Sequence, residues 1–219
     1  VGRHAVSETG DDVYGRSEGS ADIAAAEPDD ENSGDRICSI SKTFPRVLVC
    51  KAVEEGLLTL DDTLERYYPK IANSPGITLG RMLSHRSGIA SYTDDPLFTL
   101  WSQQPKSEKE LVAVIKKMGA AFPPGEKTQY SNSNYLLLSY ILEKAYGKPY
   151  GEILSEKIIA PLSLGHTYLG LPRESECRSY VYMDGWQALP PWHHSVTMGA
   201  GGIVSTAEDL GWFIRALLG

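Results

Sequence analysis

Two segments of helical length are largely apolar, and they restrict the chain to folds in which helices are buried. Residues 39–55 place apolar side chains on nearly every face of a helix, and Gly56 follows at a position where glycine commonly ends one. Residues 134–146 are also strongly apolar and are followed by Gly147. Because a helix that is apolar all round must be covered by other elements, the sequence predicts a buried helix over residues 39–55.

Capping signals mark further helices between and after these two. A serine or threonine before an apolar stretch accepts a hydrogen bond from the first turn of a helix, and a glutamate three residues later can return one. The sequence contains such starts at Thr78 before a helix through Leu83, at Ser107 with Glu110 before residues 108–118, and at Ser205 with Glu208 before a helix to Leu218. Residues 162–204 are rich in proline, glycine and aromatic residues and are predicted to be mostly loop.

The first 36 residues differ in composition from the rest. They hold ten acidic residues and three arginines and so carry the whole formal charge of −7, while residues 37–219 are neutral. Residues 1–7 and 13–23 predict two weak strands of a hairpin around a turn at residues 9–12. Since the chain has no basic stripe, neither a nucleic acid nor an anionic membrane is expected as a partner. No stretch approaches the roughly 20 apolar residues that a membrane span needs.

The overall composition fits a globular chain and gives no support for a cysteine-based site. Apolar residues make up 42% and charged residues 22% of the sequence, as in ordinary folded domains. Cys38, Cys50 and Cys177 show no C-x-x-C spacing and no nearby pair of histidines, which argues against structural zinc. One disulfide with one spare thiol is left open, and so is the cellular compartment.

Two short strings carry residues suited to nucleophilic catalysis. Ser39 and Lys42 fit the pattern S-x-x-K, which places a serine and a lysine on one face of a helix. The start of a helix favours negative charge on the serine, and a lysine in a buried site can lose its proton and act as a base. Tyr130 and Asn132 stand just before the second apolar helix, where a tyrosine hydroxyl can relay protons and an asparagine can hold an ammonium group or an amide. Alone, the strings also fit a helix cap with a surface lysine and a core tyrosine with a bonded hydroxyl.

Five blocks of sequence, in the same order, resemble the serine β-lactamase-like family. They are residues 37–44 (ICSISKTF), 53–62 (VEEGLLTLDD), 77–88 (ITLGRMLSHRSG), 124–135 (PGEKTQYSNSNY) and 199–210 (GAGGIVSTAEDL). Within this family the chain is most similar to the class C branch, which contains class C β-lactamases, D-Ala-D-Ala carboxypeptidases and family VIII esterases. Each block is weak alone, but five in order are specific, and they cover the chain from about residue 36 to its end.

The resemblance implies a serine hydrolase and a role for each site residue. Ser39 matches the nucleophile, Lys42 its general base, Tyr130 the tyrosine that assists proton transfer, and Asn132 a contact for substrate and lysine. The implied reaction is acyl-enzyme formation on an ester, D-amino-acid peptide or β-lactam carbonyl, followed by release by water. It uses no metal and no organic cofactor, and the expected partner is a small-molecule or peptide acyl substrate. The family also suggests a secreted or periplasmic location, while the oligomeric state is left open.

Some positions depart from the family pattern. The third family motif, Lys/His-Thr-Gly, is missing, so the chain is expected to be truncated before it, and the nearest string, residues 165–168, is interpreted as a coincidence. Cys38 stands where the family prefers glycine, and its side chain is expected to crowd the site. Pro45 falls in the second turn of the predicted helix, where a kink would cost up to about 3 kcal/mol. The alternative function is a catalytically impaired or inactive relative or fragment that serves as a ligand- or partner-binding scaffold.

Other residues that invite a functional interpretation are given no catalytic role. His85 stands beside Ser84 and near Ser87, but no acid is placed to orient it, and it falls where the family has a structural turn. His193 and His194 lack the carboxylate or cysteine neighbours of a metal site and are interpreted as loop histidines. Three aromatic residues fit a substrate cleft and a loop anchor equally well: Tyr182, Trp186 and Trp192.

Together these signals predict an α+β chain with a β-lactamase/transpeptidase-like fold, in which a helical domain stands beside an incomplete antiparallel sheet flanked by helices. Residues 1–56 are expected to form the amino-terminal hairpin and the nucleophile helix of the α/β part, and residues 57–160 the helical domain. Residues 161–219 are expected to form an irregular loop region and a final helix that leads back to the α/β part. The catalytic serine would lie where the two parts meet.

Overall fold

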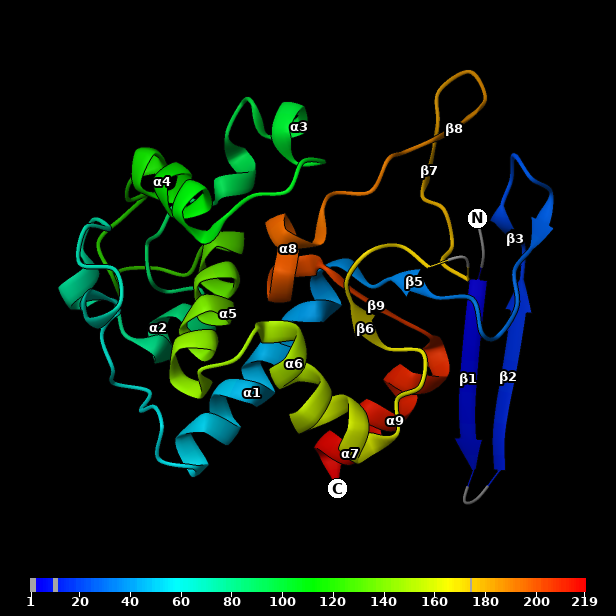
Figure 1. Cartoon of the computed structure of the whole chain (residues 1–219), viewed down its shortest axis with the longest axis horizontal. Helices are drawn as coiled ribbons and strands as arrows, with labels where there is room; N and C mark the ends of the chain where they lie inside the picture. The colour runs from blue at the N-terminus through cyan, green and yellow to red at the C-terminus, as the bar shows by residue number, and fades with distance from the viewer. Residues whose placement is uncertain (1–2, 10–11, 174) are drawn as a thin grey trace.

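The computed structural model describes residues 3–9, 12–173 and 175–219, in which helices and short strands combine as an α+β fold (Figure 1). The α-helices are α1 (Thr43–Glu54), α2 (Leu79–Leu83), α3 (Phe98–Trp101), α4 (Glu108–Met118), α5 (Asn132–Tyr146), α6 (Tyr150–Leu154), α7 (Ala160–Leu162), α8 (His194–Gly201) and α9 (Ala207–Leu218). Short 3-10 or π-helical turns are η1 (Cys38–Lys42), η2 (Leu64–Arg66), η3 (Ser74–Gly76), η4 (Tyr92–Asp94) and η5 (Ser155–Ile159). Within the described residues, no helix combines the length and the apolar character needed to cross a bilayer.

The strands of the described residues form small antiparallel sheets. The pairs are β1 (Arg3–Thr9) with β2 (Asp12–Glu18), β3 (Ser20–Asp22) with β4 (Glu27–Pro28), and β7 (Tyr180–Tyr182) with β8 (Trp186–Ala188). A three-stranded sheet has the order β5 (Asp35–Arg36), β9 (Ile203–Ser205), β6 (Tyr168–Leu169). The predicted amino-terminal hairpin is present as β1 and β2, but its second strand ends at Glu18 rather than at residue 23, because residues 20–22 form β3 and pair with β4. Residues 1 and 2 of its first strand and residues 10 and 11 of its turn lie outside the described residues.

Helix α5 forms the centre of the helical part of the molecule, and α1, α2, α4, α6 and α8 pack against it (Figure 1). The side chains of residues 135–138 are fully buried, so they cover the whole circumference of one turn. This burial explains why the sequence is apolar on all sides of the helix. The helix predicted over residues 134–146 is confirmed and begins at Asn132, and it ends at Gly147, whose φ of 68° lies in the region that favours glycine.

The helix predicted over residues 39–55 is divided into η1 and α1. η1 carries Ser39 and Lys42, and α1 follows directly with Phe44 and Leu48 fully buried. Pro45 therefore lies in the first turn of α1, where a residue needs no backbone donor inside the helix. The predicted kink within one regular helix is wrong, because the chain changes from 3-10 to α-helix before Pro45.

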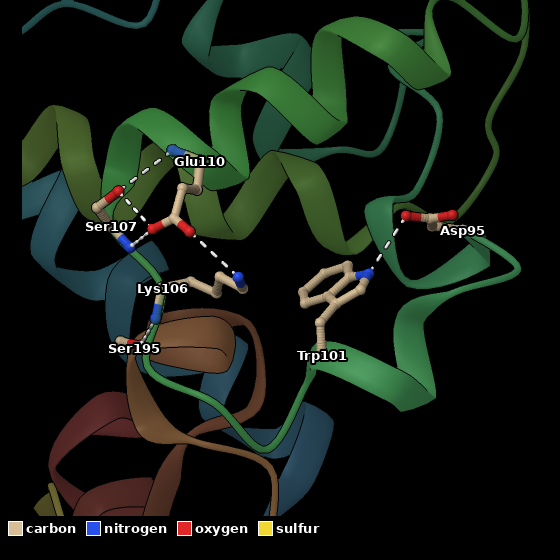
Figure 2. A network of polar contacts seen from close by, with 6 residues as sticks. All are labelled: Asp95, Trp101, Lys106, Ser107, Glu110 and Ser195. Carbon is tan, nitrogen blue, oxygen red and sulfur yellow. Dashed lines mark hydrogen bonds and ion pairs between the residues drawn. The ribbon is translucent and has the colours of Figure 1, made fainter.

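Two of the predicted helix starts are confirmed in detail. Thr78 accepts a hydrogen bond from the Arg81 amide at the start of α2. Ser107 and Glu110 form the predicted capping box at the start of α4, shown in Figure 2. The backbone and hydroxyl groups of Ser107 donate to the Glu110 carboxylate, and these bonds lower the pKa of Glu110 to about 2.

The third predicted start is wrong by one residue. Thr206 caps α9 by accepting from the Asp209 amide at 3.3 Å, while Ser205 ends strand β9 and is fully buried. The Ser205 hydroxyl instead lies 2.8 Å from the Thr167 hydroxyl of the loop before β6. The strand therefore extends to the position that the sequence pattern assigned to the cap.

Residues 162–204 are mostly loop, as predicted, but they also contain α8 and the strands β6 to β8 and lead into β9. Helix α8 packs against α5 on one side and against η1 and β9 on the other (Figure 1). It contains Met198 with φ 36° and ψ −131°, which are not helical values. Tertiary contacts, rather than a local helix signal, thus hold this segment in place. The predicted domain boundaries at residues 56 and 160 remain a prediction.

Candidate active site

The side chain of Ser39 lies in the wall of a cavity of about 610 Å³. Segments far apart in the sequence meet there: η1 carries Ser39, the segment that leads into α5 carries Tyr130, α5 begins with Asn132, and α8 contributes Ala200 and Gly201. The outer wall comes from η4, from residues around the end of α3, and from the loop at residues 189–192. Three of the predicted site residues, Ser39, Tyr130 and Asn132, therefore line one shared cavity.

Ser39, Lys42 and Tyr130 form one hydrogen-bonded group. Ser39 Oγ lies 2.7 Å from the Tyr130 hydroxyl, and Lys42 Nζ donates to the same Oγ at 3.2 Å. The contact with Lys42 follows from η1, because residues three apart in a 3-10 helix stand one above the other. Tyr130 reaches the serine from 91 residues further along the chain, so only the tertiary fold creates that contact.

The environment of Lys42 favours its neutral form. The residue is 6% exposed, and this burial lowers its pKa from the ordinary 10.5, while the hydrogen bond and charge of Tyr130 act in the opposite direction. The ammonium group also donates to the carbonyl oxygen of Ala200 and lies 4.9 Å from the ring centre of Tyr130. Among the groups that shift this pKa in the described part of the chain there is no carboxylate. A neutral lysine can accept a proton from the adjacent serine.

Asn132 lines the cavity, and residues at the start of η4 bind it. Its backbone amide donates to Ser91 Oγ at 3.2 Å, and its side-chain Nδ2 donates to Thr93 Oγ1 at 3.0 Å. Among the described residues, Lys42 donates to Ser39 and Ala200, and the predicted contact between Asn132 and Lys42 remains a prediction. The residues of η4 therefore orient the amide of Asn132 within the cavity.

Cys38 precedes the serine in a left-handed backbone conformation, with φ 46°. Glycine adopts this conformation at the lowest cost, which gives a physical reason for a glycine preference at this position. The Cys38 thiol is exposed and lines the same cavity. The expected crowding is not seen at the serine, because Ser39 keeps its hydrogen bonds to Tyr130 and Lys42.

The remaining residues singled out in the sequence have structural contacts. His193 lies in the loop before α8, as predicted, and is the N-cap of that helix, since its side chain accepts from the Ser195 amide. The prediction of a loop is wrong for His194, which is the first residue of α8. Trp192 lines the cavity, whereas Tyr182 and Trp186 pack edge to face against each other at 5.3 Å outside its wall. In the described parts of the chain, no group of three or more metal-ligating side chains could hold an ion.

Sequence reasoning missed the partners that hold the site residues. The carbonyl of Ala200 accepts from Lys42, and the hydroxyl of Thr93 accepts from Asn132. Ala200 stands within the glycine-rich block 199–202, which signals a close approach of backbone to another element. Thr93 had no local signal, because its contact depends on how η4 packs against the start of α5.

The comparisons with known proteins agree with the resemblance seen in the sequence. A family model described as Beta-lactamase matches residues 4–219. Penicillin-binding protein 4* of Bacillus subtilis (strain 168) is 30% identical over 241 residues, and the match covers 96% of this chain and 51% of the relative. Beta-lactamase of Escherichia coli (strain K12) is 28% identical over 203 residues, covering 91% and 52%. The chain thus spans about half the length of these curated relatives.

A solved structure extends the similarity to the fold. D-amino acid amidase from Ochrobactrum anthropi SV3, solved in complex with L-phenylalanine amide, is similar with a TM-score of 0.89 and 28% sequence identity. The similarity covers 98% of this chain and 64% of that chain. The fold that the sequence resemblance implied is therefore confirmed.

Proposed function

Because the chain belongs to the beta-lactamase family, we propose that it is a serine hydrolase that forms an acyl-enzyme on Ser39. One observation carries the proposal: Ser39 Oγ is within hydrogen-bonding distance of both Lys42 and Tyr130. A weak nucleophile becomes reactive when an adjacent base can take its proton, and acyl transfer needs such a pair.

In the proposed first step, neutral Lys42 accepts the proton of Ser39 while Oγ attacks the carbonyl carbon of the substrate. Tyr130 assists the transfer of a proton to the leaving nitrogen or oxygen as its bond to the carbonyl carbon breaks. In the second step, water adds to the acyl carbon, the ester bond to Ser39 breaks, and a proton returns to the serine oxygen. The lowered pKa of Lys42 supports this role, because more of the lysine is then unprotonated at neutral pH.

The backbone N–H of Ser39 is proposed to stabilise the oxyanion of the tetrahedral intermediate. The N–H groups at the start of a helix have no acceptor inside the helix. At the start of η1 the amide of Ile40 donates to the Ile37 carbonyl at 3.0 Å. The amide of Ser39 comes one residue earlier in the chain, in the first turn of η1. Donors aimed at developing negative charge are a major part of catalysis in acyl transfer.

The proposed substrates contain an acyl group attached to oxygen or nitrogen: an ester, a D-amino-acid peptide or amide, or a β-lactam. The names of the relatives support this range, since they describe a penicillin-binding protein, a beta-lactamase and a D-amino acid amidase. Asn132 lines the cavity with a group that both donates and accepts, and it is proposed to contact the substrate amide. In this scheme the reaction needs neither a metal ion nor an organic cofactor.

Covalent labelling tests the proposal directly. The chain is incubated with a fluorophosphonate probe or a β-lactam, and adducts are located by mass spectrometry. One adduct per chain on Ser39 is expected, with no adduct in Ser39→Ala. Ser155→Ala removes an exposed serine on η5 and is expected to leave labelling unchanged. Labelling that persists in Ser39→Ala contradicts the proposal, and a folded chain that takes no label favours the non-catalytic scaffold.

Two further substitutions separate the base from the tyrosine. Lys42→Met removes the proton acceptor and is expected to slow labelling by about 10² to 10⁴-fold, the usual contribution of a general base. Tyr130→Phe keeps the ring but removes the hydroxyl that bonds Ser39, and a smaller loss is expected. Equal rates for Lys42→Met and the unsubstituted protein would remove Lys42 from the scheme.

A further inference from the structure

The loop after α2 brings a histidine with no assigned role beside Tyr130. His85 is half-buried and has φ 57°, a left-handed conformation that is uncommon for a residue other than glycine. Its backbone amide donates to the Met82 carbonyl at 3.2 Å, which ties it to α2. The conformation directs both the carbonyl and the imidazole of His85 toward the segment that carries Tyr130.

His85 holds the chain on both sides of Tyr130. Its carbonyl oxygen accepts from the Gln129 amide at 3.0 Å, and its ring Nδ1 accepts from the Ser131 amide at 3.2 Å. Between these two bonds, the imidazole stacks on the phenol ring of Tyr130, with ring centres 4.7 Å apart and an interplanar angle of 29°. One residue thus contacts Tyr130 through its neighbours and through its ring.

The hydrogen bonds around Nδ1 identify its protonation state. A ring nitrogen accepts an N–H only when it carries no proton, so the donation from Ser131 requires the proton to be on Nε2. A second set of hydrogen bonds also indicates that Nδ1 carries no proton. Ser87 Oγ accepts from the Ile89 amide and donates to Asn134 Oδ1 at 2.6 Å, which leaves the donor Nδ2 of Asn134 facing His85 Nδ1 at 3.4 Å.

The charged and titratable groups that face the imidazole disfavour its cationic form. Lys42 comes from η1, Arg46 from α1, Tyr130 from the loop before α5, and Tyr135 from α5 itself. Burial lowers the pKa of His85 from 6.5, and the positive charges of Arg46 and of Lys42 in its protonated form lower it further. The ring is therefore neutral at pH 7.

We propose that His85, neutral and with its proton on Nε2, is a positioning residue that holds the Tyr130 hydroxyl against Ser39 Oγ. This inference rests on the proposed function, because it gives Tyr130 a precise place in the proton transfer. Tyr130 is 50% exposed, so packing alone restrains it weakly. A displacement of about 1 Å at a reacting group can cost about 10²-fold in rate.

Two substitutions separate the acceptor from the ring. His85→Asn keeps an acceptor near the position of Nδ1 and tolerates the left-handed conformation, but it lacks the stacked ring. His85→Phe keeps a ring and removes the acceptor. The rate of Ser39 labelling is expected to fall by about ten- to a hundredfold in His85→Phe and by less in His85→Asn. Thermal unfolding of each variant shows whether it is folded, and His166→Asn, which changes an exposed histidine, is the matched control.

The pH profile distinguishes positioning from a purely structural role. In the unsubstituted protein, protonation of His85 below pH 6.5 adds a proton on Nδ1 that opposes the Ser131 amide. The labelling rate is therefore expected to fall more steeply in acid than the titration of Lys42 alone requires. His85→Asn has no titrating group at this position, so its labelling rate is expected to fall in acid only as the titration of Lys42 requires. The proposal is overturned if the labelling rates of His85→Asn and the unsubstituted protein fall equally steeply in acid. It is also overturned if a folded His85→Phe is labelled at an unchanged rate.

A measurement independent of activity keeps this inference separate from the proposed function. The nitrogen-15 spectrum of the histidines is recorded at pH 7 on Ser39→Ala, with His85→Asn used to assign the His85 signals. Unprotonated Nδ1 and protonated Nε2 are expected for His85, and a proton on Nδ1 overturns the proposal. If the unsubstituted chain takes no label, the proposed function fails while the spectrum still decides the state of His85.

Discussion

Helix α5 and the segment from α8 to β9 both help to form the Ser39 site, but they are held by different means. Helix α5 is surrounded by apolar side chains, and residues 135–138 are fully buried. In the other segment the backbone itself approaches its neighbours, since a Cβ on Gly199 would lie 2.6 Å from Ser139 Oγ and one on Gly202 would lie 2.6 Å from Thr197 Oγ1. The first region depends on side-chain volume, and the second depends on the absence of side chains.

The segment from α8 to β9 also contains a strained backbone conformation, which its close backbone contacts help to maintain. Met198 has φ 36°, a value that costs a residue other than glycine of order 1–3 kcal/mol. It stands two residues before Ala200, whose carbonyl accepts the hydrogen bond from Lys42. The close contact of Gly199 with α5 restrains this conformation from one side. The region with the weaker local helix signals therefore supplies an acceptor for the lysine.

The largest expected effect comes from removing side-chain volume in α5. Leu138 is 0% exposed, and Leu138→Ala should lower the free energy of unfolding by about 3 kcal/mol, because it loses apolar burial and leaves a cavity. Chemical denaturation measures the change. Leu100→Ala makes the same substitution at a residue that is 77% exposed and should change stability little. Similar losses for both variants would contradict the dependence of α5 on buried side-chain volume.

A smaller loss is expected from adding a single methyl group to the other region. Gly199→Ala places a Cβ within 3.0 Å of Ser139, Pro45 and Tyr150, and it should cost about 2 kcal/mol through overpacking. Gly151→Ala is the matched control, because no atom lies within 4 Å of its Cβ and alanine is the better helix former. Gly151→Ala should stabilise the protein by up to about 1 kcal/mol. If denaturation curves show no loss of stability in Gly199→Ala, then α8 can move away from α5 without cost.

Helix α4 packs against α5, and α9 follows β9, so the caps of these two helices offer a finer comparison. Ser107→Ala removes an exposed cap of α4 and should cost about 1 kcal/mol. Thr206→Ala removes a cap that is 2% exposed, so its partner amide has less access to water and the cost should approach about 2 kcal/mol. Thermal unfolding of the two variants, measured side by side, shows which of them loses more stability. A larger loss for Ser107→Ala would mean that burial does not strengthen the cap of α9.

The smallest expected effect concerns Lys42, where the two regions meet. It is a change in how the free energy of unfolding depends on pH. The pKa of Lys42 is lowered from 10.5 in the folded protein, so between the lowered value and 10.5 the unfolded chain binds a proton that the folded chain lacks. The free energy of unfolding attributable to Lys42 therefore rises with pH through this window. The difference between the unsubstituted protein and Lys42→Met should show that rise, and exposed Lys109→Met should not. A difference that is flat with pH contradicts the lowered pKa.

The sequence predicted the helices whose signals are local. The capping box of Ser107 and Glu110 and the cap at Thr78 are confirmed, because each involves groups within one turn of a helix. The strongly apolar helix predicted over residues 134–146 is also confirmed, and residues 135–138 of it are fully buried. Where the competing interaction was long-range, the prediction failed: Ser205 belongs to β9 because β5 and β6 pair with that strand.

The same division applies to the site. The spacing of Ser39 and Lys42 determined their contact, because a single turn of helix joins them. The sequence by itself also determined the family of the chain, since its ordered motifs do not depend on contacts. Only the tertiary structure decided that Tyr130 meets Ser39, that Ala200 meets Lys42, and that His85 flanks Tyr130. These contacts join residues distant in the sequence, and packing of whole elements rather than local conformational preference brings such residues within hydrogen-bonding distance.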